Sequence, residues 1–154
     1  MADRHRSIID LHLILRRDDS RILLLRRANT GYCDGRLHLP SGHLEAGESA
    51  VDGVIREARE EVGVTVSPAD LQFVHAMHRS GEDGGTDRIG LFWQTTRWVG
   101  EPSNAEPAKC SELLWVDQLP PDTIGYPAAG IHHAADGIAF SLYGWHDHQI
   151  GPAD

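Results

Sequence analysis

The chain has 154 residues, of which 40% are hydrophobic and 24% charged, and its formal net charge is −9 at pH 7. This composition is typical of a soluble globular protein with a hydrophobic core, so we expect a single domain over residues 1–154. The acidic balance argues against a nucleic-acid polymer as a partner, because such partners bind basic surfaces. No apolar run approaches the roughly 18 residues of a membrane-spanning helix, and residues 1–15 do not have the pattern of a signal peptide.

The cysteines and histidines give little sign of a structural metal or a disulfide framework. Cys33 and Cys110 have no metal-type spacing and are too few for a disulfide scaffold, so we expect a reducing, cytoplasmic location. The ten histidines are scattered along the chain. The best-spaced pair, His146 and His148 in YGWHDHQ, is better explained as part of a solvated tail than as a zinc site.

The first part of the chain predicts two strands. Apolar and polar residues alternate over residues 7–15, which is typical of a half-buried strand. Residues 21–27 are a short apolar run typical of a buried strand, and the intervening RRDDS turn predicts that the two strands pair as a hairpin. A glycine-rich loop, NTGYCDGR, and a short extended segment at residues 37–40 follow.

The next segment, SGHLEAGESAVDGVIREAREEVGV, has the most unusual charge pattern in the chain. Its first part predicts a loop, and residues 49–62 predict a helix that Gly63 ends. On an ideal helix, Glu57, Glu60 and Glu61 gather within roughly 100° along one edge of the apolar face. Partly desolvated carboxylates cost free energy unless positive charge is near. A solvated charged face is one explanation of this edge, and a bound divalent cation is the other.

The rest of the chain predicts further strands and one more helix. We expect strands at residues 71–79 and 88–99, a polar connection, a strand at 113–116 and a helix at 127–137, followed by a short strand or loop. The order of strands, helix, strands and helix predicts an α+β fold in which residues 49–62 pack on a sheet.

The acidic helix and the loop before it match the pattern G-x5-E-x7-R-E-U-x-E-E-x-G-U at every position, where U is aliphatic. Seven fixed positions would match by chance in roughly 10⁻⁸ of windows. The fixed residues are Gly42, Glu48, Arg56, Glu57, Glu60, Glu61 and Gly63. This segment, residues 42–64, resembles the Nudix box, the signature of the Nudix hydrolase family. The resemblance implies an α/β/α sandwich with a mixed β-sheet and a hydrolase that acts on acid anhydrides.

Nudix enzymes hydrolyse a diphosphate linked to another group X and use magnesium or manganese. The resemblance therefore implies that Glu57, Glu60 and Glu61 are metal ligands and catalytic residues, with Glu57 and Glu61 as the main ligands. The backbone carbonyl of Ser41 or Gly42 is expected to add a further ligand. The metal would neutralise the diphosphate and orient it for in-line attack by water.

Other residues of the box are expected to support the site. Arg56 is predicted to pair with Glu48 or Glu60 and so to hold the loop on the helix. Gly42 and Gly63 are expected to serve backbone geometry, as is Gly47.

A fourth carboxylate often joins the metal site in this family. Glu106 and Glu112 are the candidates here, and Glu112 matches the position better. The alternative is that Glu112 is a surface glutamate at the edge of a strand.

The identity of X is less defined by the sequence. The marks of the diadenosine-polyphosphate and ADP-ribose subgroups are absent, since Arg79 and Ser80 lie near that point. Residues 101–121, EPSNAEPAKCSELLWVDQLPP, are similar to a segment of MutT-homologue nucleoside triphosphate diphosphatases, which implies cleavage of a nucleoside triphosphate to a monophosphate and pyrophosphate. Tyr32 and Tyr126 are candidate substrate-binding residues.

Two other functions stay open at this point. The chain could hydrolyse another X-diphosphate, such as a nucleotide sugar or a prenyl diphosphate, or it could be a non-catalytic nucleotide-binding sensor. The expected partner is a small-molecule diphosphate, with no nucleic-acid polymer and no membrane. A homodimer is kept as an option for the assembly.

Overall fold

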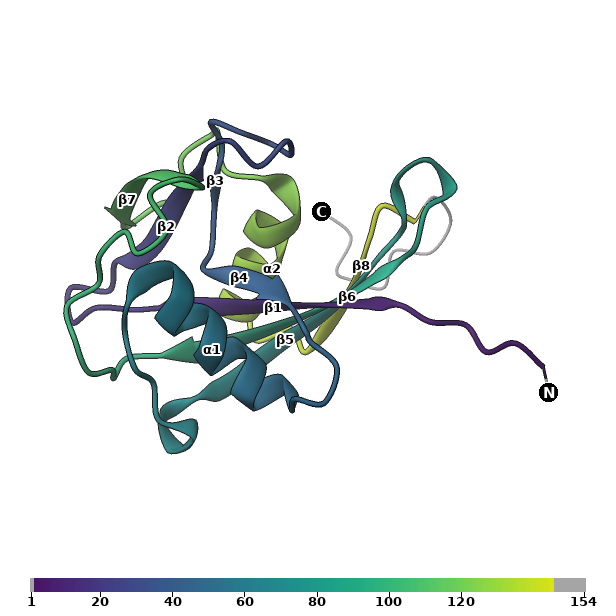
Figure 1. The fold of residues 1–154 in the computed structure, drawn as a ribbon, viewed down its shortest axis with the longest axis horizontal. Helices are drawn as coiled ribbons and strands as arrows, with labels where there is room; N and C mark the ends of the chain where they lie inside the picture. The colour runs from purple at the N-terminus through teal and green to yellow at the C-terminus, as the bar shows by residue number, and fades with distance from the viewer. Residues whose placement is uncertain (1, 146–154) are drawn as a thin grey trace.

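A computed structural model of the chain describes residues 2–145 (Figure 1). His146 and His148 lie outside the described residues. The strands in the described part are β1 (Ile8–Leu15), β2 (Ile22–Arg27), β3 (Leu37–His38), β4 (Ser41–His43), β5 (Gln72–Arg79), β6 (Arg88–Thr95), β7 (Cys110–Val116) and β8 (Phe140–Tyr143). The helices are α1 (Ala50–Val62) and α2 (Gly125–Ala135), with short 3-10 turns at Pro68–Asp70 and Glu82–Gly84.

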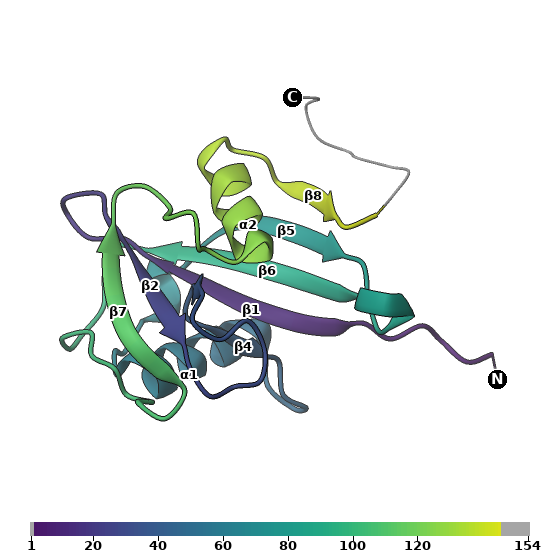
Figure 2. The same ribbon diagram turned by 90° about the horizontal axis from the view of Figure 1, so that it is seen from above.

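The strands form two sheets. The larger sheet has the order β4-β1-β6-β5-β8, and the smaller has the order β3-β2-β7. Strand β1 pairs in parallel with β6 and antiparallel with β4, so the larger sheet is mixed. Figure 2 shows α1 on one face of this sheet and α2 on the other. The arrangement confirms the predicted α+β fold with an α/β/α sandwich and a mixed sheet.

The predicted hairpin of residues 7–15 with 21–27 is wrong. Strands β1 and β2 belong to different sheets, and among the described residues the ladder between them is reduced to one isolated bridge, Arg16 with Ile22. The turn itself is present, with Ser20 at φ 68°. Beyond the turn the strands diverge. All eight residues of β1 pair with β6, whereas β2 pairs with β7.

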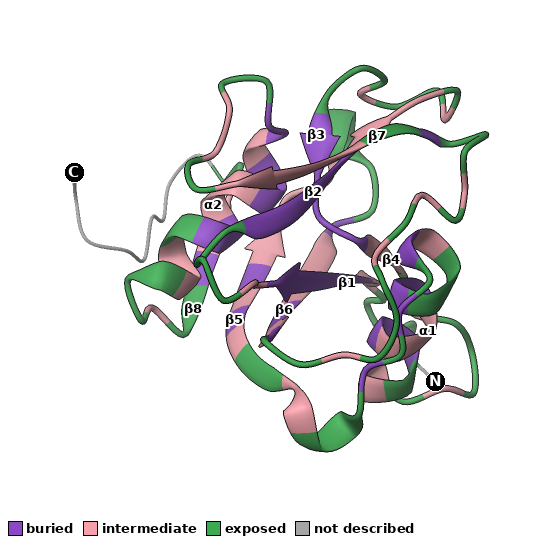
Figure 3. Ribbon diagram, turned by 90° about the vertical axis from the view of Figure 1, so that its left-hand side faces the viewer, coloured by how far each residue is buried: buried purple, intermediate pink, exposed green. Residues whose placement is uncertain are grey.

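Strand β1 is buried on both faces rather than on one, as Figure 3 shows. Leu11, Leu13 and Leu15 pack in the core beneath α1, and Ile14 packs in the second core with residues of α2. Because side chains alternate along a strand, His12 points to the same side as Ile14. The polar residues of the alternating pattern are therefore enclosed, with His12 only 5% exposed.

Helix α1 has the boundaries that its sequence predicts. Ser49 caps its N-terminus by accepting a hydrogen bond from the backbone N–H of Asp52, and Gly63 ends it in the left-handed conformation at φ 71°. The segment before it is less irregular than expected, because residues 41–43 of the predicted loop form β4, which pairs with β1. This edge strand lies beside α1 and brings the start of the Gly42–Gly63 pattern next to its carboxylates.

The C-terminal elements are shifted from their predicted bounds. Strand β7 begins at residue 110 rather than 113, β6 stops at residue 95 rather than 99, and α2 begins two residues earlier than expected. The final strand, β8, forms and pairs in parallel with β5. Between residues 2 and 145, no helix is long and apolar enough to span a membrane.

Candidate active site

A cleft of about 770 Å³ lies between the two sheets and reaches the C-terminal half of α1. Its walls include side chains of β1, β2, β3 and β6, together with the segment that leads into α2. Six carboxylates line the cleft, from Asp10, Glu57, Glu60, Glu61, Glu82 and Glu106. Proteins bind small molecules in clefts of this size, so this is the candidate active site.

The carboxylate of Glu57 lies against the backbone of β4 at Gly42. A Cβ atom at position 42 would collide with that carboxylate, so a side chain there would push Glu57 away. Gly42 is thus needed for a close approach. Gly47 and Gly63 differ, because their φ angles of 84° and 71° lie in the left-handed region that favours glycine. The pattern therefore places a glycine where the acidic helix edge meets the edge strand.

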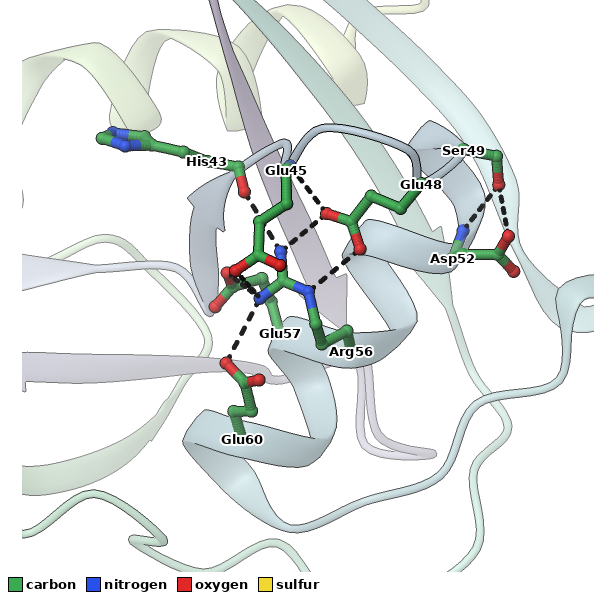
Figure 4. A network of polar contacts seen from close by, with 8 residues as sticks. All are labelled: His43, Glu45, Glu48, Ser49, Asp52, Arg56, Glu57 and Glu60. Carbon is green, nitrogen blue, oxygen red and sulfur yellow. Dashed lines mark hydrogen bonds and ion pairs between the residues drawn. The ribbon is translucent and has the colours of Figure 1, made fainter.

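Arg56 connects the loop before α1 to the acidic edge of the helix (Figure 4). Its Nε and Nη2 donate to the two carboxylate oxygens of Glu48 at 3.0 and 2.8 Å, and Nη2 also donates to the His43 carbonyl at 3.1 Å. Its Nη1 donates to Glu57 at 2.7 Å and to Glu60 at 3.2 Å. Both pairings expected for Arg56 are thus present, and they tie the loop to the helix.

The negative charge of the Glu61 carboxylate is compensated less well than that of Glu57. Its Oε2 accepts a long hydrogen bond of 3.4 Å from the Ser41 backbone N–H. Burial raises the pKa of Glu61 well above its usual value, and the nearby charges of Glu57 and Glu106 raise it further. Burial also raises the pKa of Glu57, although Arg56 partly offsets that effect. Positive charge beside these two carboxylates would therefore be stabilising.

The donor set fits a hard divalent cation. Within residues 2–145, no three histidine, cysteine, aspartate or glutamate side chains form a ready-made metal cluster. Magnesium does not require one, because it usually keeps several waters and binds one or two carboxylates together with substrate phosphates. Glu57 and Glu61 can provide such carboxylates, and the neighbouring β4 backbone offers carbonyl oxygens.

The sequence profile of the NUDIX domain family matches residues 8–130, which contain strands β1 to β7 and helix α1. This chain belongs to the Nudix family. The 8-oxo-dGTP diphosphatase of Escherichia coli (strain K12) is 32% identical over 113 residues, 70% of this chain and 84% of that protein. The ADP-ribose pyrophosphatase of Methanocaldococcus jannaschii is 29% identical over 102 residues, 66% of this chain and 59% of that protein.

The solved structures agree on the fold. A MutT NUDIX hydrolase from Burkholderia pseudomallei superposes with a TM-score of 0.73 at 22% identity, over 88% of this chain and 100% of that one. The chain is a MutT-like Nudix hydrolase, an enzyme that acts on acid anhydrides. Hydrolases of this family generally use divalent metal ions.

The structure brings Glu106, not Glu112, to the Nudix box. The backbone N–H of Ala105 donates to the Glu61 carbonyl at 3.1 Å, which places the next residue beside the end of α1. Glu112 instead pairs with Arg26 at 2.9 Å and does not line the cleft. Side chains alternate along β2, and the residues before and after Arg26 line the cleft, so Arg26 and its cross-strand partner Glu112 face away from it. The predicted placement of Glu112 is therefore wrong.

Both predicted tyrosines line the cleft, Tyr32 from the loop after β2 and Tyr126 from the start of α2. Tyr32 is 41% exposed in the loop after β2, where the Arg27 guanidinium lies 5.4 Å from its ring centroid. Tyr126 is 6% exposed at the start of α2, and the Arg79 guanidinium lies 4.9 Å from its ring centroid. Their contact with a substrate stays a prediction.

Several cleft residues were not singled out from the sequence. Asp10 of β1 is buried, and its carboxylate accepts a 2.7 Å hydrogen bond from Arg88 of β6. His12 and His38 are also buried in the cleft wall, and burial lowers the pKa of each to about 3. For Asp10 and His12 the available signal was the alternation in residues 7–15, because both lie on the face of β1 that lines the cleft.

Proposed function

We propose that the chain is a magnesium-dependent pyrophosphohydrolase that cleaves a nucleoside triphosphate to a nucleoside monophosphate and pyrophosphate. Manganese is the alternative metal ion. We further propose that residues 1–154 form a single domain and that the enzyme works in the cytoplasm. The observation that carries the proposal is the gathering of the box carboxylates and Glu106 along one cleft. The E. coli relative is named as a diphosphatase of 8-oxo-dGTP, which supports a nucleoside triphosphate as the substrate.

In this proposal Glu57 and Glu61 hold the cation, while Glu60 and Glu106 add negative charge around it. When bound there, a divalent ion would supply positive charge that offsets the charge of the phosphates and favours in-line attack by water. Arg56 keeps Glu57 in place through its 2.7 Å hydrogen bond. One carboxylate of the box accepts a proton from the attacking water.

The cleft also contains basic side chains that can bind the outer phosphate oxygens. Arg27 of β2 and Lys109 before β7 both line the cleft. Arg27 also donates to the Tyr32 carbonyl at 2.8 Å, so its guanidinium is held at the cleft rim. Charge-assisted hydrogen bonds from such groups would position the phosphates without taking part in bond cleavage.

The test is a hydrolysis screen with the purified full chain in magnesium and in EDTA. The substrates are nucleoside triphosphates, 8-oxo-dGTP, nucleotide sugars, ADP-ribose and a prenyl diphosphate, and chromatography separates the products. We expect a monophosphate and pyrophosphate from at least one triphosphate, with turnover lost in EDTA. If only another diphosphate is hydrolysed, the proposed substrate is wrong, but the proposed role of the carboxylates is kept. If the protein binds one of the compounds but hydrolyses none, the proposed hydrolase activity is contradicted and a non-catalytic nucleotide-binding sensor is supported.

A further inference from the structure

Helix α1 covers only part of one face of the larger sheet. It packs mainly on β1 and β4, at one edge of the sheet, whereas β8 forms the opposite edge. Helix α2 packs on β5 from the other face (Figure 2). The half of the α1 face that belongs to β5 and β8 therefore lies outside the main contacts of both helices.

This half of the sheet presents apolar side chains to the surface, and we call it the uncovered face. Cross-strand partners point to the same side of a sheet, and the partners on this side are Phe73, Ala76, Ile89, Leu91, Phe140 and Leu142. Phe73 is 51% exposed and Phe140 44%, and the other four are partly buried. A contiguous apolar surface of this kind marks a protein interface.

The end of the described chain extends the uncovered face. Trp145, which is exposed, follows β8, and its ring centroid lies 4.7 Å from that of His78. Its indole N–H donates to the His78 carbonyl at 2.9 Å, so the ring is fixed on β5. The apolar surface thus runs along the whole length of β5.

The uncovered face has no charged member, although the chain has 23 acidic and 14 basic residues. Two molecules that each carry a net charge of −9 can therefore meet here without placing carboxylates against each other. A strongly basic partner would gain no ion pair from this face. Residues 146–154, HDHQIGPAD, contain one large apolar residue, Ile150, which is too few to match it.

The shape of this side of the molecule is complementary to itself. Packed sheets lie about 10 Å apart, and a helix with its side chains is about 10 to 12 Å across. Helix α1 is therefore a step about as tall as the gap between two packed sheets. A two-fold axis along the strands places α1 of each copy beside β8 of the other, which fills both steps. An axis across the strands would superimpose the two helices.

We propose that a second copy of this chain packs on the uncovered face, in a two-fold dimer whose axis runs along the strands. The same side chains of both copies form the interface, as in other two-fold dimers. Asp10 and His12 line the cleft from the other face of β1, so the cleft stays open in both subunits. The dimer is an addition to the proposed function and does not depend on it.

Arg59 lies on the flank of α1 that faces the uncovered face. At 100° per residue it is on the opposite side of the apolar stripe from Glu57, whose carboxylate lies against β4. Gly53 of the same helix lies against Leu11 of β1. Arg59 is about 9 Å further along, toward the C-terminal end of β1 and hence toward the start of β5. An exposed guanidinium therefore borders the interface at that level.

Asp136 supplies the complementary charge at the edge of β8. It is exposed in the segment that joins α2 to β8. The carbonyl of Ile138, two residues later, accepts a 2.7 Å hydrogen bond from His75 near the start of β5. Asp136 and Arg59 therefore lie at a similar level along the strands. An axis along the strands keeps that level, so Arg59 approaches Asp136 of the partner subunit.

Sedimentation equilibrium of the purified full chain, without nucleotide, tests the dimer. At about 100 µM we expect twice the chain mass of 17.0 kDa, because interfaces of standard size are occupied at such concentrations. A monomer under these conditions would overturn the inference. A dimer without hydrolysis of any compound would keep the inference and reject the proposed function.

Variants locate the interface. Phe140→Glu places a carboxylate in the uncovered face of both subunits and should weaken dimerisation at least about 30-fold, and Phe73→Glu should act in the same way. Val99→Glu is the matched control, because Val99 is 75% exposed but pairs with Thr65, away from β5 and β8. Circular dichroism establishes that each protein folds. If both face variants dimerise as tightly as the control, another surface forms the dimer and the proposal is wrong.

A charge exchange tests the direction of the axis. Arg59→Asp and Asp136→Arg should each weaken the dimer several-fold, because each brings like charges together. The double variant restores the opposite charges in exchanged places, so its dissociation constant should return to within about twofold of wild type. Losses that add up in the double variant would contradict the proposed axis.

Discussion

Arg56 and Glu48 form a two-pronged ion pair, in which Nε and Nη2 of the guanidinium donate to both oxygens of one carboxylate. The remaining nitrogen, Nη1, donates to Glu57 at 2.7 Å. One side chain therefore fixes the loop before α1 and also orients a proposed metal ligand. The pairing is geometric as well as electrostatic, because only a planar fork can satisfy all these acceptors together.

Arg56→Lys should consequently impair the enzyme although it keeps the charge. A lysine has a single ammonium group and cannot hold Glu48 and Glu57 at once. Changes to groups that orient metal ligands typically reduce metal affinity or activity about 10- to 100-fold, and we expect a loss in that range. Magnesium titration calorimetry and steady-state kinetics would measure it. Wild-type magnesium affinity in the lysine variant would contradict the orienting role.

Glu61→Gln should have opposite effects on activity and on stability. Turnover should fall by at least about 100-fold, because the variant removes a charged ligand of the proposed cation. In EDTA at neutral pH the melting temperature should rise. The raised pKa of Glu61 means that its ionised form destabilises the metal-free fold, and a neutral amide removes that charge. Scanning fluorimetry with EDTA and with magnesium tests both parts, and near-wild-type turnover would reject the assignment.

Glu106→Gln and Glu112→Gln form a matched pair. Glu106 lies close enough to Glu61 to raise its pKa, whereas Glu112 pairs with Arg26 outside the cleft. We expect Glu106→Gln to weaken magnesium-supported turnover several-fold, and Glu112→Gln to behave as wild type. The reverse ranking in a kcat/KM comparison would restore the assignment that the sequence favoured.

Acid should destabilise the protein through its buried histidines. The pKa of His12 is lowered from 6.5 to about 3, so below pH 6.5 the unfolded chain takes up a proton that the folded chain does not. Stability from this group is present above pH 6.5 and is lost as the pH falls toward 3, and His38 acts in the same direction.

His12→Phe isolates that contribution. Between pH 7 and pH 5, the drop in unfolding free energy should be smaller than in wild type by up to about 2 kcal/mol. Urea unfolding at both pH values, in EDTA, measures the difference. The same drop in both proteins would show that His12 is not held neutral in the fold.

The features that the sequence predicted well are local ones. Ser49 and Gly63 mark the ends of α1 because a cap is decided by a few neighbouring residues. The pairing of Arg56 with Glu48 and Glu60 also lies within one segment. The hairpin failed for the opposite reason, since the choice of β6 as the partner of β1 depends on residues far along the chain.

The same division applies to the site. The carboxylates of the Nudix box could be located from their spacing in the sequence, but the cleft residues of β1 and β6 could not. Asp10 and Arg88 meet because β1 and β6 lie side by side, and nothing near either residue in the sequence indicates that contact. Glu106 and Glu112 could not be separated either, because the strand that carries Glu112 starts three residues earlier than its apolar run suggests.

The parallel pairing of β1 with β6 also bears on how the protein is made. Ile8 lies opposite Arg88, so the first strand leaves the ribosome several seconds before its main partner is synthesised. During that interval the apolar side chains of Leu11, Leu13 and Leu15 have no sheet to join. The larger sheet therefore cannot form until β6 has been synthesised, and we expect chaperones that shield nascent apolar segments to affect the yield of this protein more than they affect helical proteins of similar length.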